Sequence, residues 1–183
     1  MQEPSDPDAL LIQQLQAGQA GAFDELMGRY QRPVLNFVYR LLGDAAEAED
    51  VAQEVFVRVH QRLGTYQPPA RFSTWLFALA RNAAIDHLRW RKRHPTDPLD
   101  EVSEPSAGRS VTEEVHGHEV GDQIAAAVAQ LPEEQRTAVI LSEYHGMSYA
   151  EIAAVLRSSE KSVETRLYRA KQTLRQRLRH LLD

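Results

Sequence analysis

The 183-residue chain contains no cysteine. This absence excludes a disulfide scaffold, a thiol nucleophile, a cysteine-ligated zinc site and an internal redox switch. No apolar run approaches the ~20 residues of a transmembrane helix, and no alternating run is long enough to indicate a strand. The acidic residues 1–8 also lack the basic and apolar regions of a signal peptide. We therefore expect an all-α, soluble, cytoplasmic protein without membrane insertion.

Composition divides the chain into three parts. Hydrophobic residues make up 43% of the sequence, which is enough for real cores. Residues 95–122 hold eight acidic residues and one basic residue, together with several prolines and glycines. This composition is typical of a flexible acidic linker. We predict two small helical domains at 1–93 and 122–183, joined by a linker at 94–121, with the first helix of the second domain starting near Asp122.

Individual residues indicate where helices of the first domain begin and end. Pro33 fits poorly inside a continuous helix, so we expect a kink or a break there. Gly43 is typical of a helix C-terminus, and Asp44 is a good cap for the helix that follows. Residues 66–70 contain two adjacent prolines and indicate a loop. A further helix is expected from about 72 to 93.

The net charge of −5 conceals two basic segments. Residues 81–94 carry five basic residues and one acid, and residues 157–182 carry eight basic residues and two acids. Two basic segments in an acidic protein favour two contacts with a polyanion such as nucleic acid. The alternative is that both segments are solvated helix faces, which is the commoner role of charge runs.

The C-terminal part has the pattern of a helix-turn-helix. Ser148 and Glu151 have the spacing of a capping box at the start of a short helix. After a turn at 157–158, Ser159 opens a longer helix whose apolar residues share one stripe. That stripe consists of Val163, Leu167, Ala170 and Leu174. An ordinary helical hairpin with a basic exterior is the alternative.

The other side of this longer helix carries hydroxyl and basic groups, which suit the major groove of duplex DNA. Glu164 flanks that side and would repel phosphates, unless it accepts from a cytosine amino group or pairs with Arg169. The side chains that we predict to contact bases or phosphates are Lys161, Ser162, Thr165, Arg166, Tyr168 and Arg169.

The helix expected after residue 71 combines aromatic and basic residues, which suits single-stranded nucleic acid. Asn82, Asp86 and Arg89 share one polar face of that helix. A rigid loop beside a helix can form a pocket for an unpaired base. We assign Phe72 and Trp75 to the core in preference to base stacking. Asp86 with Arg89 is also open to interpretation as a simple ion pair.

Four sequence blocks occur in the order typical of one bacterial protein family. They are residues 22–26, 48–56, 74–89 and 131–170, within stretches that span 10–93 and 122–180. With these blocks the chain resembles the sigma-70 class of RNA polymerase sigma factors, in the small extracytoplasmic-function (ECF) group.

The resemblance implies a non-enzymatic promoter-specificity subunit that works with core RNA polymerase, through the β′ clamp helices and the β subunit. It implies that Asp50, Gln53 and Glu54 dock on the clamp helices. It also implies control by a cognate anti-sigma factor. The C-terminal helix would read the minus-35 element of promoter DNA. The residues that would open and hold the minus-10 element are Tyr66, Arg71, Arg81, Asn82, Asp86 and Arg89.

The chain departs from the family pattern at three places. Residues 68–70 read Pro-Pro-Ala, where the family loop usually has glycine and small polar residues. Arg157 stands where glycine is common, at a position that often requires a positive φ. Glu164 replaces a residue that is often basic, so the minus-35 sequence is not inherited from relatives.

Two other function classes are open from the residues alone. A free-standing helix-turn-helix regulator would bind duplex DNA tightly without polymerase. An enzyme would need a site, and the one candidate metal site is His116 and His118 beside acids of the linker, without a supporting shell. No phosphate-binding glycine loop and no nucleophile–base set occurs in the sequence. We therefore expect no enzyme, no metal and no cofactor.

Overall fold

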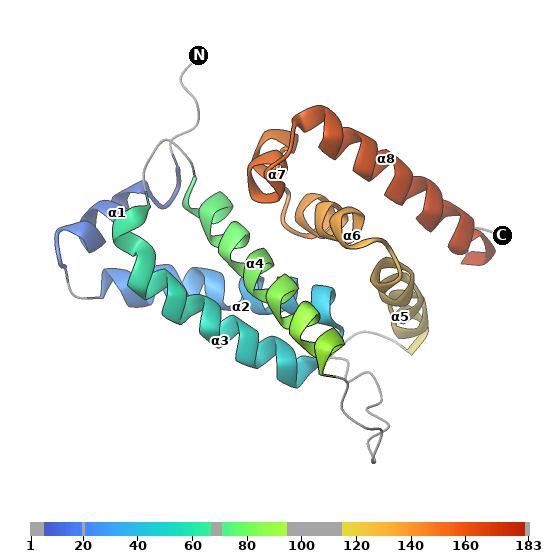
Figure 1. Ribbon diagram of the computed structural model, residues 1–183, viewed down its shortest axis with the longest axis horizontal. Coiled ribbons are helices and arrows are strands. Elements are labelled where there is room, and N and C mark those ends of the chain that lie inside the picture. The colour runs from blue at the N-terminus through green and yellow to red at the C-terminus, as the bar shows by residue number, and fades with distance from the viewer. Residues whose placement is uncertain (1–5, 20, 67–70, 95–114, 182–183) are drawn as a thin grey trace.

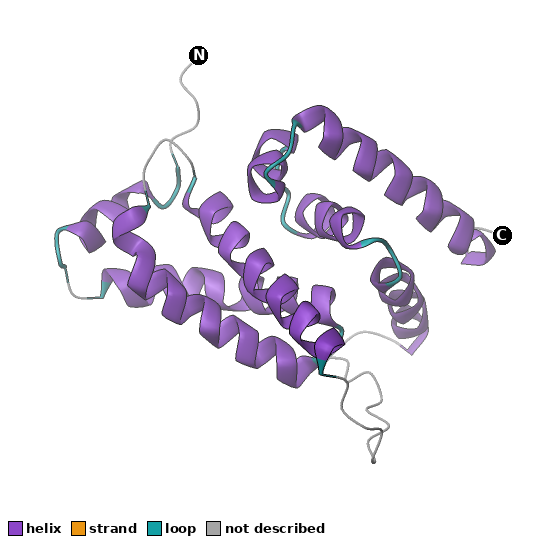
Figure 2. Ribbon diagram, viewed as in Figure 1, coloured by secondary structure: helices purple, strands orange, loops and turns teal. Residues whose placement is uncertain are grey.

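The computed structural model describes residues 6–19, 21–66, 71–94 and 115–181. Every regular element within these ranges is helical, which confirms the all-α prediction (Figures 1 and 2). The first domain contains α1 (Ala9–Gln16), α2 (Ala22–Leu42), α3 (Ala45–Arg62), the 3₁₀ turn η1 (Leu63–Thr65) and α4 (Phe72–Arg93). The second contains α5 (Val115–Ala129), α6 (Glu133–Val139), the π-helical turn η2 (Ile140–Tyr144), α7 (Tyr149–Leu156), α8 (Glu160–Arg177) and η3 (Arg179–Leu181).

The linker prediction falls mainly on residues 95–114, which lie outside the described residues. The first helix of the second domain, α5, begins at Val115, so the helix start expected near Asp122 is wrong. The glycines at 117 and 121, which suggested loop, are tolerated inside this helix. A glycine within a helix weakens it by about 1 kcal/mol without forbidding it.

Helices α2, α3 and α4 pack against one another to form the core of the first domain, and α1 lies against α2 (Figure 1). Phe37, Phe72 and Leu76 are fully buried in this core. The assignment of Phe72 to the core is thereby confirmed. Burying one such side chain stabilises the fold by about 1.5–3 kcal/mol relative to leaving it in water.

Helix α2 continues through Pro33, so the expected break is wrong. Proline has no N–H to donate to the carbonyl four residues earlier, and an interior proline costs about 3 kcal/mol. Burial of each apolar residue that follows it stabilises the fold by about 1.5–3 kcal/mol, and together these residues outweigh the cost of the proline. These residues are Val34, Phe37, Val38 and Leu41, each no more than 1% exposed.

The predicted helix ends at Gly43 and Asp44 are confirmed. Gly43 follows α2 with φ of +81°, a left-handed conformation that a glycine adopts without a side-chain clash. The Asp44 carboxylate accepts a hydrogen bond from the Glu47 N–H at 2.8 Å, which satisfies one unpaired donor of the first turn of α3.

The second domain contains the predicted helix-turn-helix in α7 and α8. The capping box is formed: the Glu151 N–H donates to Ser148 Oγ at 3.3 Å, and the Ser148 N–H donates to Glu151 Oε2 at 2.8 Å. Arg157 occupies the turn with φ of +50° and ψ of +48°. Ser159 caps α8 by accepting from the Ser162 N–H at 3.2 Å. The stripe packs inward, with Val163, Leu167 and Ala170 buried and Leu174 partly buried.

The two domains pack against each other, with α7 beside α4 (Figure 1). The His145 ring packs against two phenylalanines that also contact each other, with its centroid 4.5 Å from that of Phe77 and 5.8 Å from that of Phe37. The Arg40 guanidinium lies 3.6 Å from the centre of the Tyr144 ring, within cation–π range. Aromatic rings therefore form the centre of the interface between the domains.

A half-buried arginine, Arg136, adds hydrogen bonds across this interface. Arg136 donates from Nη1 to the Leu41 carbonyl at 2.8 Å and from Nη2 to the Leu131 carbonyl at 3.2 Å. The first bond crosses from the second domain to the C-terminal end of α2. It satisfies one of the last carbonyls of that helix, which has no partner within the helix itself.

We expect Arg157→Gly to raise the free energy of unfolding by about 0.5–1 kcal/mol. Arg157 is the one non-glycine residue with positive φ among those described. A side chain in this conformation costs about 1–2 kcal/mol, and the greater entropy of glycine in the unfolded chain offsets part of the gain. Denaturant titration measures the change. The control Gly43→Ala introduces the same backbone strain at a position where the new Cβ would meet no other atom. It should lower stability by about 1 kcal/mol. Unchanged or reduced stability in Arg157→Gly contradicts the strain argument.

We expect His145 to make the packed structure sensitive to acid. Burial and the neighbouring Arg40 charge lower the pKa of His145 from 6.5 to about 4, and its Nε2 is buried without a hydrogen-bond partner. The unfolded chain therefore takes up a proton at higher pH than the folded chain. Neutral His145 therefore contributes on the order of 3 kcal/mol to the free energy of unfolding. This contribution is fully present above pH 6.5 and is lost as the pH falls toward 4.

The measurement is the unfolding free energy of the wild type and of His145→Gln between pH 7 and pH 4. The stability of the wild type relative to His145→Gln should fall across this range, because glutamine takes up no proton. His60→Gln makes the same chemical change at an exposed position of α3 and serves as the control. If the difference in unfolding free energy between wild type and His145→Gln stays constant with pH, His145 is not the source of the acid sensitivity.

Candidate nucleic-acid interface

The outer face of α8 is open to solvent, as the sequence predicted. Lys161, Thr165, Tyr168 and Arg169 are exposed, and Tyr168 retains 65% of its accessible surface. The Thr165 hydroxyl donates to the Lys161 carbonyl at 2.9 Å, which fixes its rotamer. Glu164 is exposed among these residues. This face therefore combines cationic, hydroxyl and aromatic groups with one acid.

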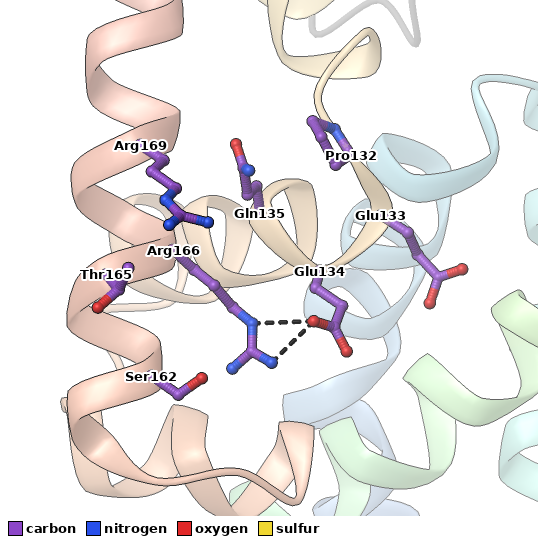
Figure 3. A pocket seen from close by; sticks show the side chains of 8 residues that line it. All are labelled: Pro132, Glu133, Glu134, Gln135, Ser162, Thr165, Arg166 and Arg169. Carbon is purple, nitrogen blue, oxygen red and sulfur yellow. Dashed lines mark hydrogen bonds and ion pairs between the residues drawn. The ribbon is translucent and has the colours of Figure 1, made fainter.

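Next to this face, α8 and the start of α6 enclose a groove of about 490 Å³. Ser162, Thr165 and Arg169 line it from α8, while Pro132 and Gln135 line it from the segment that begins α6 (Figure 3). Glu133, Glu134 and Arg166 complete the lining. Hydroxyl, amide and guanidinium groups bind phosphates and base edges, whereas the two carboxylates repel phosphates. The groove thus extends the polar face of α8 toward the neighbouring helix.

Arg166 lies differently from the other predicted DNA-contacting residues. Its Nε and Nη2 donate to Glu134 Oε2 at 2.9 and 2.7 Å, and its Nη1 donates to Ser158 Oγ at 2.9 Å (Figure 3). Only 20% of its side chain is exposed. Arg166 therefore holds α8 against α6, and a contact with DNA would require this pairing to break.

The polar face of α4 divides into an open part and a covered part. Asp86 and Arg89 are exposed, and their charged atoms lie 3.9 Å apart, at the outer limit of an ion pair. Arg81 and Asn82 are half-buried, and Arg81 Nη1 donates weakly to Asn82 Oδ1 at 3.5 Å. The half of α4 toward its C-terminus is thus the more accessible part.

Two arginines predicted to contact minus-10 DNA are instead paired with acids of the second domain. Arg71 donates from Nη1 to Glu151 Oε1 at 3.1 Å, and Arg81 donates from Nη2 to Glu133 Oε1 at 3.2 Å. Burial alone would raise the pKa of Glu151. The hydrogen bonds from Ser148 and the charge of Arg71 outweigh that effect and lower the pKa. In this structure the two arginines are therefore paired with carboxylates of the second domain.

Tyr66, which the sequence predicted to contact minus-10 DNA, is buried in this structure. Its side chain is 5% exposed, and its hydroxyl donates to Asp6 Oδ2 at 3.2 Å. Burial and the negative charge of Asp6 raise its pKa to about 12. Direct contact with a base would require Tyr66 to leave this site. The neighbouring residues 67–70 lie outside the described part of the chain.

The exposed face of α3 carries Asp50, Gln53 and Glu54, as predicted. Glu54 pairs with Arg58 at 2.6 Å. A groove of about 440 Å³ runs between α3 and α4, and Asp50, Glu54, Asp86 and Trp90 contribute to its lining. Trp90 is 51% exposed. A half-exposed tryptophan ringed by charged groups is typical of a protein-binding surface.

The described residues contain no group of three or more side chains suited to hold a metal ion. His116 and His118 lie within α5, at positions where the side chains are outside the described set. None of the described helices combines the length and the apolar character that crossing a membrane requires.

Sequence reasoning missed two sets of functional neighbours. It did not connect Glu133 and Glu151 with the arginines of α4, and it did not single out Asp6 or Asp8. The only signal for the aspartates was the acidic N-terminus, which in sequence lies about sixty residues from Tyr66.

Comparison with known families assigns both domains. Residues 26–94 match Sigma-70 region 2, and residues 121–174 match Sigma-70 region 4. The RNA polymerase sigma-H factor of Pseudomonas aeruginosa is 36% identical over 186 residues, which cover 97% of this chain and 96% of the relative. The ECF RNA polymerase sigma factor SigW of Bacillus subtilis is 30% identical, over 93% of this chain and 96% of the relative.

Solved structures show the same arrangement of helices. CnrH in complex with the cytosolic domain of CnrY superposes with a TM-score of 0.73 at 26% identity, over 94% of this chain and 97% of that chain. The sigma factor RpoE in complex with the anti-sigma factor NepR from Bartonella quintana shares the fold, with a TM-score of 0.72 at 21% identity, over 86% of this chain and 96% of that chain. From its sequence relatives and its two matched regions, the chain belongs to the sigma-70 family of RNA polymerase sigma factors, in the extracytoplasmic-function group.

Proposed function

We propose that this chain is a promoter-specificity subunit that directs RNA polymerase to initiate transcription at selected promoters. The observation that supports this most is the presence of three different exposed faces: acidic on α3, polar and basic on α4, and basic with hydroxyl groups on α8. A subunit of this kind catalyses no reaction itself, needs no cofactor and acts in the cytoplasm, where the polymerase works.

The α3 face would bind core polymerase. Asp50, Gln53 and Glu54 would meet the β′ clamp helices, because their charge complements a basic partner surface. Trp90, across the groove from Asp50 and Glu54, would add apolar contact at the centre of the interface. The second domain would contact the β subunit.

The two DNA-binding faces would divide the promoter between them. Asn82, Asp86 and Arg89 on α4 would bind the melted minus-10 element. The α8 face would enter the major groove of the minus-35 element, with Thr165 and Arg169 reaching base edges and Lys161, Ser162 and Tyr168 reaching bases or phosphates. Arg166 would join them only after leaving Glu134.

Use of the α4 face requires the two domains to separate. Arg71 and Arg81 must leave Glu151 and Glu133 before they can bind DNA, and both ion pairs are partly exposed. Such pairs contribute about 0–1 kcal/mol each, so binding to polymerase can readily replace them. We propose that the packed arrangement belongs to the free protein and the separated arrangement to the holoenzyme.

A cognate anti-sigma factor is the proposed regulator. The similar proteins CnrH and RpoE were solved with CnrY and with the anti-sigma factor NepR, respectively. A partner of this type would hold the packed arrangement of this chain by covering the faces that polymerase and promoter need.

We expect Asp50→Lys combined with Glu54→Lys to weaken binding to core polymerase by about tenfold or more. The two changes replace attraction by repulsion at the proposed basic partner surface. A fluorescence titration of core enzyme with labelled protein measures this, and run-off transcription should fall in parallel. Asp24→Lys reverses an exposed acid at the start of α2 and is the control. Unchanged core affinity in the double variant contradicts the assignment of the α3 face.

We expect Arg169→Ala and Thr165→Ala each to cost about 1–3 kcal/mol of holoenzyme affinity for a duplex carrying the selected minus-35 element. Affinity for unrelated duplex should change much less, because phosphate contacts dominate there. Arg179→Ala, at an exposed position in η3, is the matched control. Equal losses on both duplexes would assign these residues to phosphates only.

Run-off transcription with core polymerase separates the proposed function from a free-standing regulator. The proposal expects specific initiation only when this protein is added, and weak promoter binding by the protein alone. Tight operator binding by the isolated protein, with no binding to core enzyme, would support the regulator instead.

A further inference from the structure

Asp6 and Asp8, just before α1, bond to other segments of the first domain, and Asp8 is buried there. Asp8 is 2% exposed, which makes it one of the few buried polar residues in the described part of the chain. Its carboxylate accepts from Arg29 Nη1 at 3.1 Å and from the hydroxyl of Tyr30. A buried carboxylate is tolerated only when it is paired and hydrogen-bonded. These bonds to α2 therefore hold residues 6–8 in a defined place.

Asp6 is thereby positioned between the end of η1 and the start of α4. Its Oδ2 accepts from the Phe72 N–H at 2.8 Å and from the Tyr66 hydroxyl at 3.2 Å, and its Oδ1 accepts from the Asp8 N–H at 3.0 Å. Three donors from separate positions in the sequence thus meet on a single carboxylate.

Asp6 supplies the cap that α4 lacks. The N-cap residue of α4 is Arg71, which makes no capping hydrogen bond because its side chain has only donors. The Phe72 N–H is one of the first four amides of α4, which have no acceptor within the helix. A carboxylate at this end also interacts favourably with the helix dipole. Asp6 therefore serves as the N-terminal cap of α4 across 66 residues of sequence.

The same carboxylate orients the Tyr66 ring. Tyr66 packs edge-on against Phe72 and Trp75, with ring centroids 5.7 and 5.8 Å away, and Tyr30 packs against Phe72 at 5.5 Å. The rings hold Tyr66 by contact, and Asp6 holds its hydroxyl. Asp6 therefore joins the two ends, Tyr66 and Phe72, of the connection between η1 and α4.

We propose that Asp6 is a positioning residue for minus-10 recognition, acting through Tyr66 and the first turn of α4 without touching DNA. The proposal rests on the proposed function of the α4 face. In this role Tyr66 stays buried and contacts no base: with Asp6 it fixes the place where α4 begins, so the α4 face is ordered before DNA arrives. An ordered surface binds more tightly because less conformational freedom is lost on binding.

The test uses holoenzyme assembled with full-length wild type or Asp6→Ala, and a single-stranded oligonucleotide carrying the minus-10 element as the probe. We expect about tenfold weaker binding of this oligonucleotide by Asp6→Ala, and weaker permanganate reactivity of the promoter thymines. Affinity for core polymerase and for a minus-35 duplex should stay within twofold. Asp24→Ala removes an exposed acid from the same domain and should leave all three affinities unchanged.

A second variant keeps the test decisive if Asp6→Ala folds poorly. Tyr66→Phe removes only the hydroxyl that donates to Asp6, and it should weaken oligonucleotide binding several-fold. In the double variant the two losses should not add, because both act through one hydrogen bond. Additive losses, or no loss in Tyr66→Phe, would overturn the proposed coupling.

The outcomes also separate this proposal from the function on which it rests. If holoenzymes with wild type and with Asp6→Ala bind the oligonucleotide equally well, the positioning role alone is overturned. Loss of core and minus-35 binding together with minus-10 binding shows a general structural defect, and also overturns it. Wild-type holoenzyme that fails to bind the oligonucleotide overturns the proposed use of α4 and the role of Asp6 together.

Discussion

The burial of Phe37 is the contact on which both halves of the protein depend. Its ring makes edge-on contacts with Phe77 of α4 at 5.2 Å and with His145 of the second domain at 5.8 Å, measured between ring centroids. The same side chain therefore belongs to the core of the first domain and to the interface with the second. Apolar contact dominates that interface, because the ion pairs at its edge are partly exposed and weak.

The arginines at the edge of the interface pair with carboxylates in this structure, and under the proposed function the same arginines would pair with DNA phosphates. Arg71 and Arg81 hold carboxylates of the second domain in this structure, and a guanidinium binds a phosphate with the same geometry. If the proposed DNA contacts form, pairing between the domains and pairing with DNA compete for the same side chains. Glu151 also belongs to the capping box of α7. The acid that fixes the helix-turn-helix is thus the acid that covers the start of α4.

Local features could be predicted from the sequence, whereas features that join distant segments could not. The caps at Asp44, Ser148 and Ser159 depend on residues within three positions, and sequence spacing identified each of them. The stripe of α8 follows from helical periodicity alone. The bond from Arg136 to Leu41 spans 95 residues and the bond from Phe72 to Asp6 spans 66. The unbroken course of α2 through Pro33 likewise depends on packing by other helices.

The distribution of charge among surfaces matters more for this protein than its net charge of −5. At physiological ionic strength a charge is screened beyond about 8 Å. The acids on α3 therefore have little effect on a phosphate that approaches α8. Under the proposed function, each face presents its own sign to its own partner, acidic toward protein and basic toward DNA. The weak point is Glu164, which lies within the basic face of α8 itself. Salt does not screen the Glu164 carboxylate from a phosphate bound on the same face. Glu164 must therefore accept a hydrogen bond from the DNA, or it opposes DNA binding.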